Sequence, residues 1–251
     1  MGESFGPWRM GNDADLMRCI SSANIACGFH AGDASVMRRT VELAAQNNVS
    51  VGAHPGYSDL QGFGRRNMSL SAQEVYDIVL YQISALKGIC EANNVRLAHV
   101  KPHGALYNQA SRDPELARSI VGAVMALDPT LVVYGLSGSI LIEEAVKAGL
   151  ETASEVFADR SYSADGSLTP RTSGNALITD TDAAVSQVLQ MITEGTVTSQ
   201  DGIPVPIKAD TVCIHGDVEN AVPYARAIFN SLKDRGFHIC PPNSRDAGSA
   251  S

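Results

Sequence analysis

Short runs of apolar and β-branched residues alternate with longer amphipathic stretches along nearly the whole chain. The runs that predict strands cover residues 22–27, 49–53, 95–101, 130–134, 150–157 and 211–214, with a weaker one at 237–240. Because a helix-length segment separates most of these runs, we expect parallel strands joined by right-handed crossovers. The chain is therefore predicted to be an α/β protein.

The segments between the strands carry helix signals of different strength. The clearest helix covers 71–93, where a capping box precedes apolar residues that recur three and four positions apart. Another helix begins at Asp113-Pro114, and a further one follows Asp217, with Val218 in its apolar stripe. Weaker patterns predict helices over 33–47, 139–148 and 181–194.

Histidines and acids lie where predicted strands end. The histidines are His30, His54, His103 and His215, and the acids are Asp33, Glu155, Asp159 and Asp217. Because the carboxyl ends of parallel strands share one face, these side chains are expected to converge on a single pocket. An open sheet gathers its ligand at one or two switch points, whereas these residues follow at least five strands. The distribution therefore favours a (β/α) barrel.

The segment His99-Val100-Lys101-Pro102-His103 gives the strongest local signal for function. Its three polar residues share one face of a strand, and burying them is costly unless they serve a purpose. Lys101 is suited to hold an anion or to polarise a carbonyl group, and Gly104 lets a ligand approach the backbone.

Other strand-end residues have structural alternatives. Asp33 and Asp217 are also suited to cap helices, and His54 precedes a Pro-Gly turn signal. Asp159 and Arg160 can equally form a surface ion pair. The residues alone leave both interpretations open.

Length and composition favour one domain over residues 1–251, because 44% hydrophobic residues suffice for one large core. Two long segments, 55–67 and 158–179, follow strand ends and are expected to be functional loops. A hairpin excursion is predicted at about 195–210, on the face opposite the pocket, and the tail 240–251 is not assigned.

The charge of −8, without a basic run, argues against binding of nucleic acid or anionic lipid. Five cysteines without a C-x-x-C pair indicate reduced thiols. Without a recognisable signal peptide or membrane segment, we expect a cytoplasmic protein that binds a small molecule.

Several standard motifs are not found, namely the G-x-x-x-x-G-K-[ST] phosphate loop, the G-x-S-x-G elbow and the H-E-x-x-H zinc helix. A mixture of histidines and carboxylates suits either a divalent metal or metal-free acid–base chemistry. Spacing does not separate these options, so the metal content is left open.

Six ordered motifs closely resemble the LamB/YcsF family, over about residues 2–238. They are Gly2-Glu3-Ser4-Phe5-Gly6, the segment 22–33, Ala53-His54-Pro55-Gly56-Tyr57, the segment 100–108, the segment 155–160 and His215-Gly216-Asp217. The resemblance implies a seven-stranded (β/α) barrel of the glycoside hydrolase/deacetylase type. The resemblance also implies that members usually open with a strand ending in Asn-Cys-Asp-Leu-Gly-Glu, of which only Gly2-Glu3 is present, so this chain is expected to lack the first strand.

The resemblance also implies cleavage of 5-oxo-L-proline to L-glutamate, coupled to hydrolysis of ATP to ADP and phosphate. The reaction is expected in a 5-oxoprolinase complex, in which this chain is the A component and acts together with subunits B and C. A five-membered lactam is a stabilised amide, so phosphorylation of its carbonyl oxygen would make it a better electrophile for water.

On this hypothesis, the catalytic residues are Lys101, His103, Glu155, Asp159 and His215, and the residues that bind substrate or nucleotide are His30, Asp33, His54, Gly104, Arg160 and Asp217. Lys101 and Arg160 would hold phosphate or the substrate carboxylate. His103, His215 and Asp159 would activate water or protonate the leaving nitrogen. His30, His54, Glu155 and Asp217 would orient ligands or bind the Mg²⁺ that carries ATP.

Two other functions fit the same residues. One is a metal-dependent amide or polysaccharide deacetylase, for which tightly held Zn²⁺ and activity without ATP are expected. The other is a non-catalytic protein that binds a small lactam or sugar for its partners. A pure binding pocket rarely needs so many titratable groups, which disfavours the second.

Overall fold

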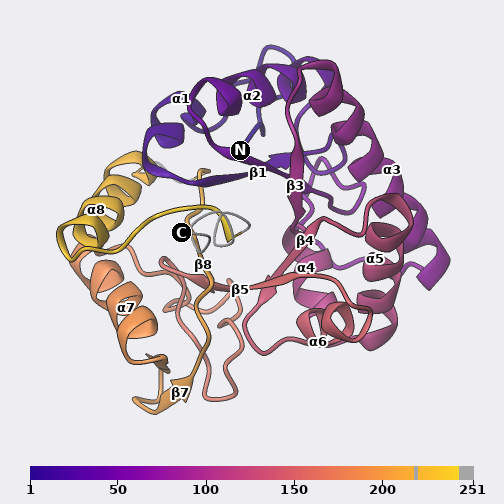
Figure 1. The fold of residues 1–251 in the computed structure, drawn as a ribbon. Helices are drawn as coiled ribbons and strands as arrows, with labels where there is room; N and C mark the ends of the chain where they lie inside the picture. The colour runs from indigo at the N-terminus through magenta and orange to yellow at the C-terminus, as the bar shows by residue number, and fades with distance from the viewer. Residues whose placement is uncertain (218–219, 243–251) are drawn as a thin grey trace, which may run out of the picture.

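A curled sheet of parallel strands forms the centre of the molecule (Figure 1). The computed structural model describes residues 1–217 and 220–242. Within them, the strand order is β1-β2-β3-β4-β5-β8, and every neighbouring pair is parallel. The strands are β1 (Ser22–Ala26), β2 (Ser50–His54), β3 (Leu97–Val100), β4 (Val132–Leu136), β5 (Thr152–Phe157) and β8 (Thr211–Cys213). The six runs predicted as strands are therefore confirmed.

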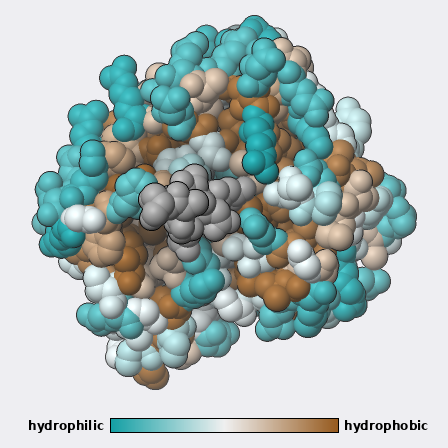
Figure 2. Space-filling model, in the orientation of Figure 1, coloured by the Kyte–Doolittle hydropathy of each residue, from teal (hydrophilic) through white to brown (hydrophobic). Residues whose placement is uncertain are grey.

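Helices surround the curved sheet on its outer side (Figure 1). They are α1 (Asp13–Leu16), the 3-10 helix η1 (Met17–Cys19), α2 (Ala34–Gln46), α3 (Ala72–Ala92), α4 (Gly104–Ala110), α5 (Pro114–Leu127), α6 (Ile140–Lys147), α7 (Thr181–Thr193) and α8 (Ala221–Asp234). In Figure 2, seen from the same side, hydrophilic residues dominate the periphery and apolar residues show between them nearer the centre.

Local sequence explains where the helices begin. In α3, the Ser71 hydroxyl accepts a hydrogen bond from the Glu74 backbone, and the Glu74 carboxylate accepts one from the Ser71 backbone. The α3 positions Val75, Val79, Ile83, Leu86 and Cys90 are all fully buried. Asp113 caps α5, and Pro114 is its first residue, as predicted. Capped, amphipathic helices can thus pack one face on the sheet and leave the other in water.

The two outer strands of the sheet, β1 and β8, are not paired with each other among the described residues. The Met1 backbone donates to the Asn24 carbonyl at 3.1 Å and accepts from the Ala26 amide at 3.0 Å, so it lies along β1. Leu16 of α1 and Cys19 of η1 pack with Ala221 and Ala225 of α8 in one apolar cluster. The described sheet is therefore a half-barrel, while the helical layer continues from α8 to α1.

Several details differ from the sequence predictions. Residues 237–240 do not form a strand: Phe237 and Ile239 pack their side chains against the core beside α8, and no strand pairs with them in the described chain. The short helix α4 was not predicted, since its seven residues have no side-chain cap. Val218 and residues 243–251 of the tail lie outside the described residues. The count of seven strands stays a prediction.

The segment 195–210 contains the two-stranded antiparallel hairpin of β6 (Thr196–Thr198) and β7 (Pro204–Pro206). Gly202 in its turn has φ +76°, a conformation that glycine adopts without strain. Within the described part of the chain, no helix is both long and apolar enough to cross a membrane.

Candidate functional site

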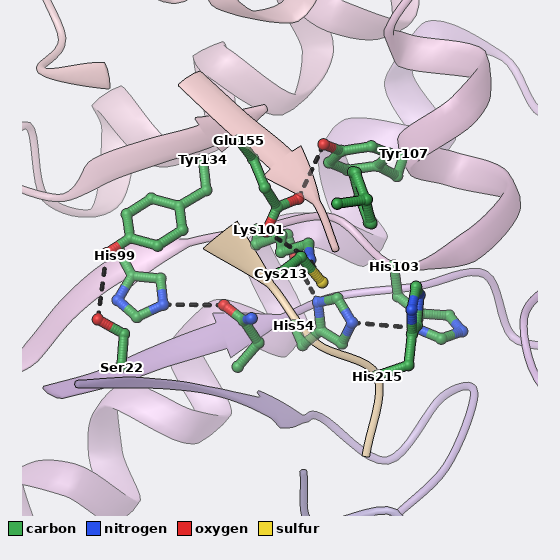
Figure 3. Close-up of polar contacts among 12 residues, drawn as sticks. Ser22, His54, His99, Lys101, His103, Tyr107, Tyr134, Glu155, Cys213 and His215 are labelled. Carbon is green, nitrogen blue, oxygen red and sulfur yellow. Dashed lines mark hydrogen bonds and ion pairs between the residues drawn. The ribbon is translucent and has the colours of Figure 1, made fainter. Parts of the chain in front are cut away.

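A cavity of about 1090 Å³ opens among the carboxyl ends of the strands. Of the predicted site residues, it is lined by His54, Lys101, His103, Gly104, Glu155, Arg160, His215 and Asp217. These residues come from β2, β3, β5, β8 and the segments that follow them, so the curled sheet brings together groups that are distant in sequence (Figure 3). The cavity also extends toward the gap between β1 and β8, where Ile20 and Phe229 line it.

Lys101 and Glu155 form an ion pair at the floor of this cavity (Figure 3). The Lys101 Nζ lies 2.7 Å from Glu155 Oε1, and the two side chains are only 6% and 2% exposed. Burial alone would lower the pKa of Lys101, but the neighbouring Cys213 and Glu155 raise it above its ordinary value. The lysine is thus a fixed positive charge facing the cavity.

Two further side chains contact the Lys101–Glu155 ion pair. Tyr107 of α4 donates its hydroxyl hydrogen to Glu155 Oε2 at 2.8 Å, and burial followed by the Glu155 charge raises the pKa of Tyr107 well above its ordinary value. Lys101 Nζ donates to Cys213 Sγ at 3.1 Å. Burial raises the pKa of Cys213 to about 12, so its thiol stays neutral and the Glu155 carboxylate is the anion that balances Lys101.

His215 and Asp159 form a second pair at the cavity. Asp159 Oδ2 accepts a hydrogen bond from His215 Nδ1 at 2.6 Å, and Arg171 donates to His215 Nε2 at 2.9 Å. Burial opposes ionisation of Asp159, yet the hydrogen bond from His215 and the nearby charge of Arg171 lower its pKa below the ordinary value. This arrangement fixes the histidine tautomer: the proton is on Nδ1, and the Nε2 lone pair faces Arg171.

A third pair joins the long segment 55–67 to the residues that follow β8, at the cavity rim. Arg65, from the segment 55–67, lies 2.6 Å from Asp217 in an ion pair. Burial opposes ionisation of Asp217, but Arg65 and the neighbouring cations lower its pKa overall. Arg65 and Arg171 both line the cavity, so two guanidinium groups lie beside the histidine–aspartate pair. Together with Lys101, they make this part of the site suited to an anion.

His30, His54 and His103 form a compact cluster below the cavity. One ligand nitrogen from each ring lies within 4.8 Å of those of the other two. The His30 and His103 rings stack with their centroids 3.7 Å apart, and His103 Nδ1 lies 3.0 Å from His54 Nε2. Burial lowers the pKa of His103 to about 3 and lowers those of His30 and His54 well below their ordinary values. The imidazoles are therefore neutral, and each has a lone pair.

A buried polar network continues from this site along the inside of the sheet (Figure 3). His99 Nε2 lies 2.9 Å from Asn24 Oδ1, and the His99 ring stacks on Tyr134 with centroids 4.0 Å apart. Ser22 Oγ and Tyr134 Oη lie 3.4 Å apart. His99 packs directly over Gly52 of β2, where a Cβ atom would lie only 2.0 Å from His99 Nε2. Glycine at this position is therefore a steric requirement.

Three of the predicted site residues, His30, Asp33 and Asp159, do not line the cavity, and Arg160, which does line it, holds a neighbouring loop. Asp33 caps α2 and accepts hydrogen bonds from the backbones of Gly6, Ser35 and Val36, outside the cavity lining. Arg160 donates to the carbonyl groups of Thr169 and Ala176, so its guanidinium holds the loop that contains them. His30 is buried in the histidine cluster and does not line the cavity.

Sequence reasoning did not single out Arg65, Arg171, Tyr107 or Cys213. Arg65 and Arg171 lie in the two long segments that were predicted to be functional, and the abundance of arginine there was the available signal. Tyr107 lies in one of the quoted motifs, but its contact with Glu155 depends on helix α4. Cys213 is buried, as cysteine residues usually are, so its sequence context gives no signal of a role in the site.

The side chains of the site can be compared with the ligands that Mg²⁺, the ion that accompanies ATP, requires. Magnesium prefers oxygen ligands, whereas the histidine cluster offers only nitrogen. Among the described residues that line the cavity, Glu155 and Asp217 are each paired with a cation. Glu155, Asp217 and the three histidines therefore do not fit a Mg²⁺ ion held by these residues alone.

Comparison with known proteins agrees with this architecture. The family model described as the LamB/YcsF family matches residues 1–247. The chain belongs to the LamB/YcsF family. It is 54% identical over 239 residues to the 5-oxoprolinase A subunit of Bacillus subtilis (strain 168), covering 95% of this chain and 93% of that one. It is 57% identical to the 5-oxoprolinase A subunit of Shouchella clausii (strain KSM-K16), covering 95% and 94%.

A solved structure of a family relative gives the same fold. The crystal structure of the lactam utilization protein from Thermus thermophilus superposes with a TM-score of 0.91 at 47% sequence identity. The match covers 96% of each chain. The half-barrel and its surrounding helices are thus shared with an experimentally determined relative.

Proposed function

We propose that this chain is the A component of an ATP-dependent 5-oxoprolinase, which hydrolyses 5-oxo-L-proline to L-glutamate together with subunits B and C. The observation that carries the proposal is the 52–57% identity to relatives that are named as the A component of 5-oxoprolinase. The site adds chemical support, because its cavity combines fixed cations with a histidine–aspartate pair.

The reaction requires a good electrophile and a proton for the leaving nitrogen. Transfer of the γ-phosphoryl group of ATP to the lactam carbonyl oxygen releases ADP and activates the carbon. Water adds to this carbon, the C–N bond breaks, and the ring nitrogen takes a proton. A second water then releases phosphate from the acyl phosphate, which leaves L-glutamate. The overall reaction therefore consumes one ATP and two waters.

The cations of the cavity are suited to the charges in this sequence. We assign Arg65 and Arg171 to the substrate carboxylate or the transferred phosphoryl group, since both line the cavity and guanidinium groups bind such anions through paired hydrogen bonds. Lys101, fixed by Glu155 at 2.7 Å, is assigned to the carbonyl oxygen on which negative charge develops.

His215 is assigned as the proton-transfer group. Its Nδ1 proton is held by Asp159, so Nε2 is the atom that can accept a proton from water and return it to the ring nitrogen. Arg171 donates to this same Nε2 in the structure. An anion that binds Arg171 would draw the guanidinium away and free the lone pair for catalysis.

The test is reconstitution of the purified chain with candidate B and C subunits. We expect phosphate and L-glutamate to appear in equal amounts, and only when both ATP and 5-oxo-L-proline are present. His215→Asn is expected to lower kcat by about 10²–10⁴-fold, the usual contribution of general acid–base catalysis. Lys147→Gln, on the exposed surface of α6, serves as the control and should retain full activity.

Two results would contradict the proposal. One is a reconstituted complex that contains all three proteins yet forms no L-glutamate from 5-oxo-L-proline. The other is full activity in both His215→Asn and Asp159→Asn, which would remove this pair from the reaction.

A further inference from the structure

We propose that His30, His54 and His103 together bind one divalent transition-metal ion of the Zn²⁺ class. The proposal concerns binding and does not depend on the reaction assigned above. It follows from the positions of the hydrogen atoms on the three rings, which their neighbours dictate.

The tautomer of His54 is set by a backbone carbonyl. His54 Nδ1 lies 2.6 Å from the Lys101 carbonyl oxygen (Figure 3). A carbonyl oxygen only accepts hydrogen bonds, so the proton of this neutral imidazole is on Nδ1. The other nitrogen, Nε2, therefore carries a lone pair.

His103 is fixed in the opposite sense. Its Nε2 lies 2.8 Å from the Phe63 carbonyl oxygen, so Nε2 carries the proton and Nδ1 carries the lone pair. His103 Nδ1 and His54 Nε2 then face each other at 3.0 Å with a lone pair on each side. Two acceptors at this distance repel each other, and a cation that binds both removes the conflict.

His30 provides the third lone pair. It is 1% exposed, and neither of its ring nitrogens has a hydrogen-bond partner among the described residues. Unpartnered buried nitrogens are costly and call for an explanation such as a bound ion. A single proton shared by His54 and His103 would satisfy only their contact, whereas a metal ion would bind one nitrogen of each of the three rings.

The surroundings of the three rings are those of a metal site. In such sites, the nitrogen that does not bind the metal commonly donates to a backbone carbonyl, as His54 and His103 do here. Glycine makes room for the rings: a Cβ atom on Gly56 would lie 2.9 Å from His30 Nδ1, and one on Gly64 would lie 2.8 Å from His103 Cδ2. Binding requires the His30 ring to turn out of its stack on His103.

The donor set selects the kind of metal. Three neutral imidazoles without a carboxylate suit zinc, nickel, copper or iron rather than magnesium or calcium. Three protein ligands leave one position of a tetrahedral ion open. Since His54 and His103 line the cavity, this open position would face the ligand-binding space.

The first test measures Zn²⁺ binding to the untagged chain, without ATP, 5-oxo-L-proline or the partner proteins. After chelator treatment and titration with Zn²⁺, elemental analysis should give one ion per chain. Replacing any one of the three ligands, by His30→Ala, His54→Ala or His103→Ala, should weaken Zn²⁺ binding by about 100-fold or more. Even residues that only hydrogen-bond to metal ligands change metal affinity by about 10–100-fold when they are replaced. His99→Gln removes a buried histidine outside the cluster and should bind Zn²⁺ like the unaltered chain.

The second test uses the unaltered chain, so it does not depend on whether a variant folds. X-ray absorption of the zinc-loaded protein should show three imidazole nitrogens at about 2.0–2.1 Å. Absence of stoichiometric Zn²⁺, or binding that all three alanine variants retain, would overturn the proposal. A spectrum with thiolate or only oxygen ligands would overturn it as well. Each of these outcomes leaves the reconstitution result for 5-oxoprolinase activity unaffected.

Discussion

Lys101 and Glu155 are opposite charges enclosed by protein, so each depends on the other. Glu155→Gln keeps the shape of the side chain but leaves the lysine ammonium without its balancing anion. We expect this change to lower the free energy of unfolding by about 3–5 kcal/mol, measured by urea denaturation. The double variant Lys101→Met with Glu155→Gln should recover part of this loss, because no uncompensated charge remains. A double variant less stable than Glu155→Gln alone would contradict this account.

His99 makes stability depend on pH. Burial lowers its pKa in the folded chain to about 3, against about 6.5 when unfolded. As the pH falls below about 6.5, the unfolded chain takes up a proton that folded His99 does not, so stability falls toward pH 3 by up to about 1.4 kcal/mol per pH unit. His99→Gln should reduce the slope of this dependence by about one proton and leave the contributions of the three clustered histidines, when unfolding is measured between about pH 6 and pH 4.5. An NMR titration showing folded His99 protonated near pH 6 would exclude the explanation.

Strands β2 and β3 pack so closely that a residue larger than glycine does not fit at position 52. Gly52→Ala would place a Cβ atom 2.0 Å from His99 Nε2, so the ring must move and lose its contacts with Asn24 and Tyr134. We expect a loss of about 3 kcal/mol or more in unfolding free energy. Gly88→Ala is the matched control, since a Cβ atom there has nothing within 4 Å, and α3 should gain about 0.5–1 kcal/mol. Equal effects of the two variants would refute the steric argument.

Helices and strands could be predicted where neighbouring residues in the sequence determine them. The capping box of α3 and the Asp113-Pro114 start of α5 act within a few residues, and both helices begin there. The weak run at 237–240 shows the limit, because an alternating apolar pattern becomes a strand only when its backbone pairs with another strand, and here Phe237 and Ile239 pack their side chains against the core instead. Helix α4 is too short for its periodicity to show, yet it positions Tyr107 against Glu155.

The curvature of the whole sheet decides which strand-end residues meet. The sequence placed histidines and acids at strand ends and predicted one pocket, and most of them do line one cavity. It could not predict that His215 meets Asp159, that Lys101 meets Glu155, or that Asp33 lies outside the cavity. Those pairings depend on contacts between residues about 50 positions apart or more, which no local pattern encodes.

The charge distribution of the whole molecule gives a last prediction. The chain has a net charge of −8, and in its cavity Lys101 and Arg65 are balanced by Glu155 and Asp217, whereas Arg171 contacts His215, so Arg171 is the cation best placed to bind an anion by a local contact. Arg171→Gln should weaken binding of 5-oxo-L-proline to the purified chain by about 10–100-fold in calorimetry, as expected for a lost charge-assisted hydrogen bond. Arg38→Gln makes the same charge change on the exposed face of α2, where Arg38 pairs with Glu42, and should alter binding less than about twofold. Because distant charges are screened by salt, raising the ionic strength should reduce any effect of Arg38→Gln first and leave most of the Arg171 effect. If both variants weaken binding equally, net charge rather than a local contact governs affinity, and the assignment of Arg171 is wrong.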